Sequence, residues 1–260
     1  MVSTWPESRN EPTLNSDGNN ASQIPPGTPD SDSPKLGSSI PVNPAYSTTL
    51  FVGIIVLAQA GFWFYSMPWP QIQEPQNLKT ACMSCFIAAM VLLVIPLLIA
   101  RVVFRRGFFE LGLGPGDFQF GWRAIFWCAP AMVIGTWIGS GDAQIKAFYP
   151  LPGDSIGDSA ADMVVWFSVY FLYYVAFEFF YRGFMLRGLQ QFDSTRYMWR
   201  LIAIQAILCF LIHIGKPNAE LIASLPASVL FGWIAWRSRS IWYGLAIHFL
   251  VGVVNDLAAM

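Results

Sequence analysis

Glu178 and Arg182 are the first residues in the chain whose types and spacing could do chemistry. They lie in YYVAFEFFYRGFMLR, residues 173–187, a stretch that is otherwise apolar and aromatic. A buried carboxylate or guanidinium costs roughly 2.5–3.5 kcal/mol each to insert into hydrocarbon, so a pair kept there has a structural or a functional role. The i,i+4 spacing puts both side chains on one helix face, where they can pair. We predict a site here, and the alternative is a neutral ion pair that holds helices together.

The two histidines of the chain, His213 and His248, both fall in or at the ends of apolar segments. A single intramembrane histidine is most often a hydrogen-bond partner between helices. Two of them, with Glu178 and Arg182 on another segment, favour a site. Two imidazoles and a carboxylate can bind zinc, which lowers the pKa of its bound water toward ~7. The same groups can activate water without a metal, and Arg182 would then orient Glu178 or stabilise negative charge.

The elements that must position these residues are membrane helices. The sequence is 55% hydrophobic, 16% aromatic and 12% charged, and apolar runs recur from Leu50 to the end. Crossing ~30 Å of hydrocarbon takes ~20 apolar residues, so we predict an all-α, polytopic helical membrane protein with about seven transmembrane helices. The net charge of −1 and the absence of a basic stripe or a Gly-rich phosphate loop exclude nucleic acid as a partner.

The predicted domains are a disordered, polar cytoplasmic tail, residues 1–48, and a helical transmembrane domain, residues 49–260. Within the second domain the segment 107–121 is predicted to lie at the membrane interface. Gly215 and Pro217 should end the helix that carries His213. The predicted spans are 50–67, 81–100, 122–139, 163–185, 199–213, 221–236 and 241–257.

The basic residues predict the orientation of the chain. With the tail inside, only three of the 15 lysines and arginines fall outside: Lys79, Lys146 and Lys216. The acidic segment 141–162 falls on that same outer side. We therefore predict a cytoplasmic N-terminus and an outer C-terminus.

Residues 163–256, a protease-like core, resemble the CAAX-prenyl protease and bacteriocin-processing (CPBP, also called Abi) family of intramembrane metalloproteases. The family motifs are EExxxR, FxxxH and HxxxN. Glu178 and Arg182 match the second glutamate and the arginine, and His213 and His248 match the two histidines. The chain departs from the motifs at three positions: Phe177 replaces the first glutamate, Cys209 the phenylalanine and Gly252 the asparagine. A bacterial branch of this family has a single-glutamate motif, EFFxRG, then a histidine with a Gly-Lys-Pro turn ending in glutamate, and a last-span histidine followed by an aspartate. The segments EFFYRG, HIGKPNAE and HFLVGVVND of this chain resemble that branch.

The resemblance implies a metal-dependent endopeptidase in a bacterial inner membrane, acting on a membrane-associated protein or peptide. It implies catalytic roles for Glu178, Arg182, His213 and His248, and a divalent metal, zinc, bound by Glu178 and both histidines. The alternatives are a non-catalytic scaffold of the same fold and a proton-coupled transporter, although no inverted repeat supports the latter. At 1.5 Å per residue, Glu178 and His213 would lie at different depths in upright helices, so the site needs a tilted span, a shifted boundary or a water-filled cavity.

We also predict a second carboxylate in place of the missing first glutamate. Hydrolysis of an amide by a two-histidine site usually employs a carboxylate to take the water proton, and Glu178 is expected to be occupied by Arg182. Glu220 begins the next span after His213, and Asp256 lies ~12 Å beyond His248 on one helix. Either Glu220 or Asp256 is the predicted second catalytic acid, and the alternative is that both are ordinary loop and helix-end acids.

Overall fold

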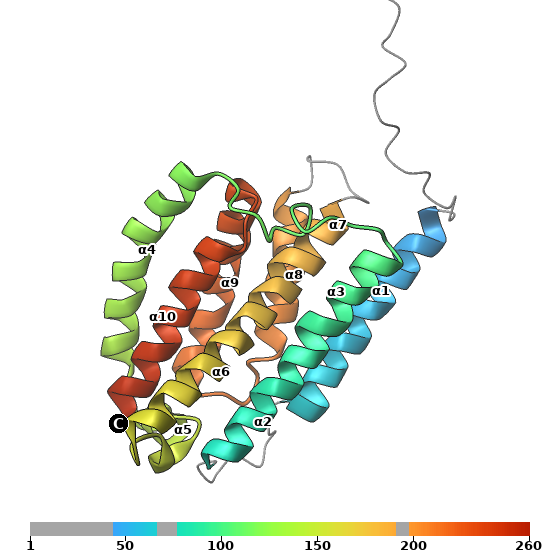
Figure 1. Ribbon diagram of the computed structural model, residues 1–260. Coiled ribbons are helices and arrows are strands. Elements are labelled where there is room, and N and C mark those ends of the chain that lie inside the picture. Colours follow the sequence, from blue (N-terminus) through green and yellow to red (C-terminus); the bar gives the residue numbers. More distant parts are fainter. Residues whose placement is uncertain (1–43, 67–76, 191–197) are drawn as a thin grey trace, which may run out of the picture. The chain divides into compact units, whose positions relative to one another are not determined.

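The computed structural model describes residues 44–66, 77–190 and 198–260 of the chain (Figure 1). Throughout these ranges the regular structure is helical and no strand is present, which confirms the predicted all-α class. The predicted tail, residues 1–48, lies outside the described residues except at its end, where the first helix begins at Pro44.

The described helices fall into two groups along the chain. The first group is α1 (Pro44–Gly61), η1 (Phe62–Ser66), α2 (Leu78–Ala89), η2 (Met90–Val94), α3 (Ile95–Val102), α4 (Phe118–Gly139), α5 (Ala143–Phe148) and η3 (Gly153–Ile156). The second group is α6 (Ala160–Glu178), η4 (Phe179–Arg187), α7 (Gly188–Gln190), α8 (Met198–Leu211), α9 (Asn218–Ser238) and α10 (Trp242–Ala259). Three of these, η1, η2 and η4, are π-helical, and η4 continues α6 without a break.

Four of the described helical segments are long and apolar enough to cross a membrane: Leu78–Val102, Ala160–Gln190, Asn218–Ser238 and Trp242–Ala259. Thr48–Phe64 and Met198–Leu211 are apolar but shorter, and α4 is not among the four. Each predicted span coincides with a described helix. The protein is an integral membrane protein, and its seven-span count is not confirmed.

The helices that carry the candidate residues pack against one another. Helix α10 contacts α4, α6 and α9, and Figure 1 shows it running alongside α6. Helix α8 is fixed to α9 by buried Gln205, whose amide donates a hydrogen bond of 2.9 Å to the carbonyl of Ser228. Helix α10 approaches α6 closely at Gly252, because a Cβ there would overlap the Tyr174 hydroxyl of α6. Close approach of α6 and α10 is what brings Glu178 and His248 together.

The segment between α3 and α4 crosses the end of the bundle in Figure 1 and has no regular helix before Phe118. It is anchored to α10, because Trp242 Nε1 donates a hydrogen bond to the Leu113 carbonyl at 2.9 Å and the Tyr243 hydroxyl donates to Pro115 at 2.6 Å. A non-helical segment at a bundle end is consistent with the interfacial position predicted for residues 107–121.

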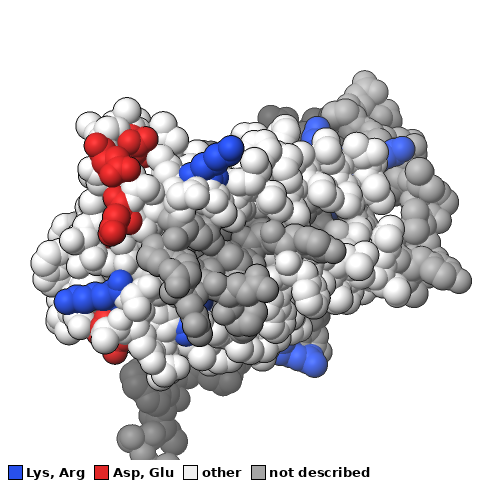
Figure 2. Space-filling view, turned by 90° about the horizontal axis from the view of Figure 1, so that it is seen from below, with Lys and Arg blue, Asp and Glu red and all other residues white. Residues whose placement is uncertain are grey.

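Acidic side chains gather at the opposite end, which Figure 2 shows from below. Asp142, Asp154 and Asp158 are exposed there, in the connection from α4 to α6. Arg105, Arg106 and Arg239 lie in the described connections at the other end. This separation is the one that the predicted orientation requires, and the orientation itself stays a prediction.

Candidate functional site

A π-helix begins at the residue that follows Glu178. Segment η4 holds Arg182 and Gly183, and it has nine residues, whereas π-helical stretches are usually single turns found at functional sites. Gly183 lets the connecting segment approach, because a Cβ there would lie 2.7 Å from the Leu111 carbonyl oxygen. The sequence EFFYRG therefore places a charged pair on a helix whose geometry changes between its two members.

Glu178 and Arg182 are fully buried, with exposed fractions of 0% and 1%, and form the predicted pair. Arg182 Nη1 lies 3.2 Å from Glu178 Oε1, yet neither Arg182 Nη1 nor Nε has a hydrogen-bond partner. The contact meets the distance of an ion pair but not the angle of a hydrogen bond. Glu178 Oε2 is also buried without a partner. Buried polar atoms left unsatisfied are costly, and they are typical of a site built for function rather than for packing.

His248 completes this first cluster from α10. Its Nδ1 lies 2.7 Å from Glu178 Oε1. Because a carboxylate only accepts, Nδ1 carries the proton and Nε2 keeps its lone pair. A carboxylate that orients a histidine in this way holds one tautomer and stabilises the imidazolium form.

His213 lies in the turn after α8, which ends at Leu211. Its Nδ1 is 2.7 Å from the Cys209 carbonyl oxygen, so this ring also donates from Nδ1 and its Nε2 is unprotonated. Gly215 supports the turn with a φ of 94°, and Pro217 precedes the first residue of α9. The helix before His213 ends at Leu211, earlier than the predicted stop at Gly215 and Pro217. The two histidines therefore have the same tautomer, one in the turn after α8 and one on α10.

Glu220 and Lys216 form a second carboxylate–cation pair, beside His213. Lys216 Nζ donates to Glu220 Oε1 at 2.6 Å, and the same oxygen lies 3.9 Å from His213 Nε2. The Tyr149 hydroxyl donates to Glu220 Oε2 at 2.8 Å. With exposed fractions of 14% and 17%, Lys216 and Glu220 are not solvated loop charges.

The His213 side chain is buried, with an exposed fraction of 9%. A neutral imidazole with a free Nε2 can accept a proton or bind a metal.

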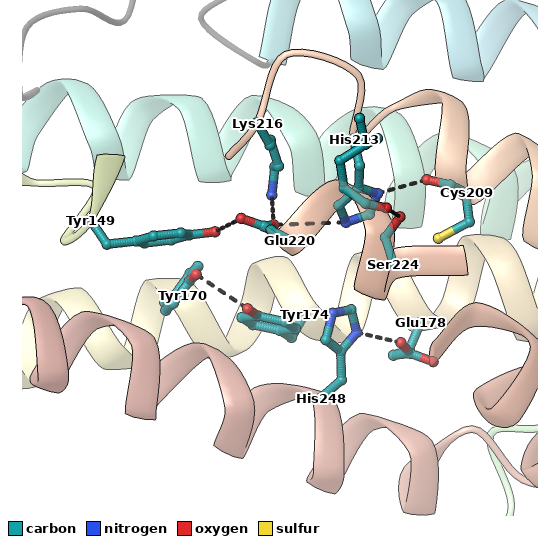
Figure 3. Close-up of polar contacts among 11 residues, drawn as sticks. Tyr149, Tyr170, Tyr174, Glu178, Cys209, His213, Lys216, Glu220, Ser224 and His248 are labelled. Carbon is teal, nitrogen blue, oxygen red and sulfur yellow. Dashed lines mark hydrogen bonds and ion pairs between the residues drawn. The ribbon is translucent and has the colours of Figure 1, made fainter. Parts of the chain in front are cut away.

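The two histidine clusters face each other in Figure 3, with His213, Lys216, Glu220 and Tyr149 in one row and Glu178, His248, Tyr174 and Tyr170 in the other. Phe177 connects them, since its ring centroid is 6.3 Å from that of His213 and 5.4 Å from that of His248. The side chain that replaces the first glutamate of the family motif thus contacts both imidazoles. Both imidazoles lie beside α6 through Phe177, and α8 ends at Leu211, before His213.

Asp256 lies apart from both histidines. It is fully buried, and its Oδ2 accepts a hydrogen bond of 2.7 Å from Trp166 Nε1. None of its described contacts is with His213 or His248. Of the two predicted second carboxylates, the structure brings only Glu220 to a histidine.

The predicted metal ligands do not converge on one point. Glu178 contacts Nδ1 of His248, and Nε2 is on the far side of the ring, so Glu178 and Nε2 cannot share one ion in this arrangement. Across the described ranges no group of three or more histidine, cysteine, aspartate or glutamate side chains is placed to hold a metal. A catalytic zinc site uses three protein ligands. The residues as arranged therefore do not fit the predicted zinc site.

Three residues of this region were missed or undervalued in the sequence. Tyr149 is 71 positions from Glu220, and nothing in the spacing connects the two. The i,i+4 spacing of Lys216 and Glu220 indicates a possible ion pair, but two solvated charges in a short turn explain the same residues equally well. Tyr174 lies one helical turn before Glu178, and its ring packs edge-on against His248 with centroids 4.7 Å apart.

Comparison with known proteins supports the resemblance drawn from the motifs. Residues 159–254 match a family described as type II CAAX prenyl endopeptidase, Rce1-like. The match contains Glu178, His213, Glu220 and His248 and ends before Asp256. No curated protein and no solved structure matches the chain.

Proposed function

We propose that this chain hydrolyses a peptide bond of a membrane-associated protein or peptide, and the match of residues 159–254 to the type II CAAX prenyl endopeptidase family supports this. The observation that supports this most is the pair of histidines on either side of Phe177, each of which donates from Nδ1 and has an unprotonated Nε2. Each histidine is matched by one carboxylate and one cation. The site is therefore nearly neutral, which limits the cost of burying it.

In the proposed reaction His248 acts first as base and then as acid. Its Nε2 accepts a proton from water while the hydroxide oxygen attacks the scissile carbonyl carbon. The imidazolium that forms is stabilised by Glu178 through Nδ1–H, at 2.7 Å in the resting site. The same proton then passes from Nε2 to the leaving amine nitrogen as the C–N bond breaks.

The remaining polar residues hold this arrangement. Arg182 balances the charge of Glu178, and we propose that His213 Nε2 orients the attacking water. Glu220 is proposed as the second carboxylate, acting on His213 from 3.9 Å. Asp256 is proposed to act only by fixing α6 to α10 through Trp166.

Metal dependence stays a separate prediction, because the proposed reaction uses only protein side chains and water. Purified protein should be analysed for zinc and other divalent metals before and after chelation. Stoichiometric metal that is lost in the His213→Ala and His248→Ala variants would establish the predicted cofactor. A metal-free protein that is active would leave the acid–base mechanism in its place.

The test of the function is cleavage of a transmembrane peptide library by the purified protein in lipid vesicles. His248→Ala and Glu178→Gln should reduce turnover by at least about 100-fold, in the range of other lost acid–base groups. Glu110→Gln, which changes an exposed glutamate, is the matched control and should cleave at the wild-type rate. Wild-type turnover in both site variants would exclude the proposed site.

A non-catalytic scaffold is the second candidate. The observation in its favour is Phe177, an apolar ring where the family motif has a glutamate, beside a buried ion pair that could serve packing alone. In that case no cleavage would be detected with the wild-type protein or with any variant. Prenylated CAAX proteins are one option among the proposed substrates, and a bacterial inner membrane is the proposed location.

A further inference from the structure

Tyr174 occupies the place of the polar side chain that the third motif lacks. The motif HxxxN calls for asparagine at position 252, where this chain has Gly252. A Cβ at Gly252 would overlap the hydroxyl of Tyr174. The volume of the missing side chain is therefore filled by a hydroxyl group from a different helix.

The position of Tyr174 is fixed from several sides. The residue is buried in α6, and its ring lies edge-on to His248 with centroids 4.7 Å apart. Its hydroxyl is 3.2 Å from that of Tyr170, and either hydroxyl of such a pair can donate. When Tyr170 donates, the proton of Tyr174 is available to another acceptor.

The neighbouring tyrosines are less suited to contact a substrate. Tyr170 stacks on Trp166 with centroids 4.6 Å apart, and Trp166 is held by Asp256. Tyr173 packs its ring against Phe62 and Phe177. Of the three, only Tyr174 combines a ring contact with His248 and a hydroxyl at Gly252.

We propose that the Tyr174 hydroxyl replaces the absent side chain at position 252 and donates a hydrogen bond to the oxygen of the scissile carbonyl beside His248. The inference rests on the proposed endopeptidase function. No bond to tyrosine forms, because the hydroxyl only stabilises the charge that develops on the carbonyl oxygen. Tyr170 acts through Tyr174 and is a positioning residue.

The first test compares Tyr174→Phe with Tyr173→Phe, the same change at the adjacent residue. Losing one such donor typically lowers kcat by roughly 100- to 1,000-fold, so Tyr174→Phe should show that loss with KM changed little. Tyr173→Phe should retain turnover within about twofold of wild type. A Tyr174→Phe protein with wild-type kcat would overturn the inference while leaving the proposed function intact.

The second test moves the polar group back to α10. Gly252→Asn alone should be inactive and should melt at a lower temperature, because its side chain overlaps Tyr174. Combining it with Tyr174→Ala makes room, and the double variant should regain the melting temperature and a measurable part of kcat relative to Tyr174→Ala. A double variant as inactive as Tyr174→Ala would contradict the replacement. Absence of cleavage by the wild-type protein would overturn this inference and the proposed function together.

Discussion

One oxygen of Glu178, Oε1, faces both His248 Nδ1 and Arg182 Nη1. The other oxygen, Oε2, has no hydrogen-bond partner. A packing role alone would favour a glutamate satisfied at both oxygens. This geometry instead leaves the carboxylate free to strengthen its bond to His248 when that ring gains a proton. The chemistry of the site therefore depends on the single residue Glu178.

Removing only one member of the buried pair should be strongly destabilising. Glu178→Gln leaves Arg182 as an uncompensated buried charge, which costs about 3–5 kcal/mol, and Glu178→Gln combined with Arg182→Met should recover most of that stability. The measurement is thermal unfolding in detergent. The matched control is the exposed i,i+4 pair Arg106–Glu110, where Glu110→Gln should change stability by less than about 1 kcal/mol. Equal stability of Glu178→Gln and wild type would show that the pair carries no charge interaction.

Glu220 and Asp256 should differ in what they lose on neutralisation. Glu220→Gln removes the charge beside His213 and should lower turnover at least about tenfold, because the histidine loses its carboxylate partner. Asp256→Asn can keep a carbonyl acceptor for Trp166, so turnover should stay within about threefold of wild type. Both are measured in the vesicle cleavage assay, with membrane abundance as the control. Wild-type turnover in both variants, with Glu178→Gln inactive, would mean that Glu178 acts without a second carboxylate.

Among the elements, η4 matters most, because a π-helix sets the angle between Glu178 and Arg182. Its backbone also contacts the segment between α3 and α4 at Gly183, where there is no room for a side chain. That segment is in turn bound to the start of α10 by Trp242 and Tyr243. The glycine therefore links the motif helix to the helix that carries His248.

Gly183→Ala should disturb both stability and the site. The added methyl group would lie 2.7 Å from the Leu111 carbonyl oxygen, and that backbone is anchored to α10, so either η4 or the segment must move. We expect a melting temperature several degrees lower, since overpacking costs about 1–3 kcal/mol, together with reduced cleavage. Gly135→Ala is the matched control, because nothing lies within 4 Å of its added Cβ and alanine favours a helix by about 1 kcal/mol. Equal melting of Gly183→Ala and wild type would contradict this role for Gly183.

On the scale of the whole molecule, the arginine-rich and acidic ends of the bundle lie opposite each other. His213, Glu220 and Tyr149 lie toward the acidic end, where the connection through α5 reaches α9. Asn218 N–H donates to Gln144 Oε1 at 3.0 Å across that connection. If the acidic end is outside, the second histidine cluster is covered from the outer side.

The topology can be measured with reporter tags at both termini and in the two connections at opposite ends. We expect the N-terminus and the segment 103–117 to be cytoplasmic, and the C-terminus and the segment 141–159 to be outside, because arginines are retained inside. Tags inserted at residues exposed to solvent give the cleanest result, for example beside Asp158. Both termini on one side would rule out seven crossings and favour an even number.

The sequence by itself determined the helical class and the positions of the helices, and it made Glu178, Arg182, His213 and His248 the candidate residues. It could do so because hydrocarbon burial makes apolar runs long and makes each charged or imidazole group in them conspicuous. The predicted helix stop at Gly215 and Pro217 was too late, since α8 already ends at Leu211.

Only the tertiary structure decided which of these groups meet. Glu178 contacts Nδ1 of His248, and Glu220 rather than Asp256 lies beside His213. Tyr149 reaches Glu220 from a segment far away in the chain, and the Tyr174 hydroxyl lies against Gly252. These outcomes depend on the rotation of one helix against another and on where α8 ends, which are set by packing between segments far apart in the chain. Residue spacing fixes neighbours within one helix, and it carries no information about which face of a second helix lies against them.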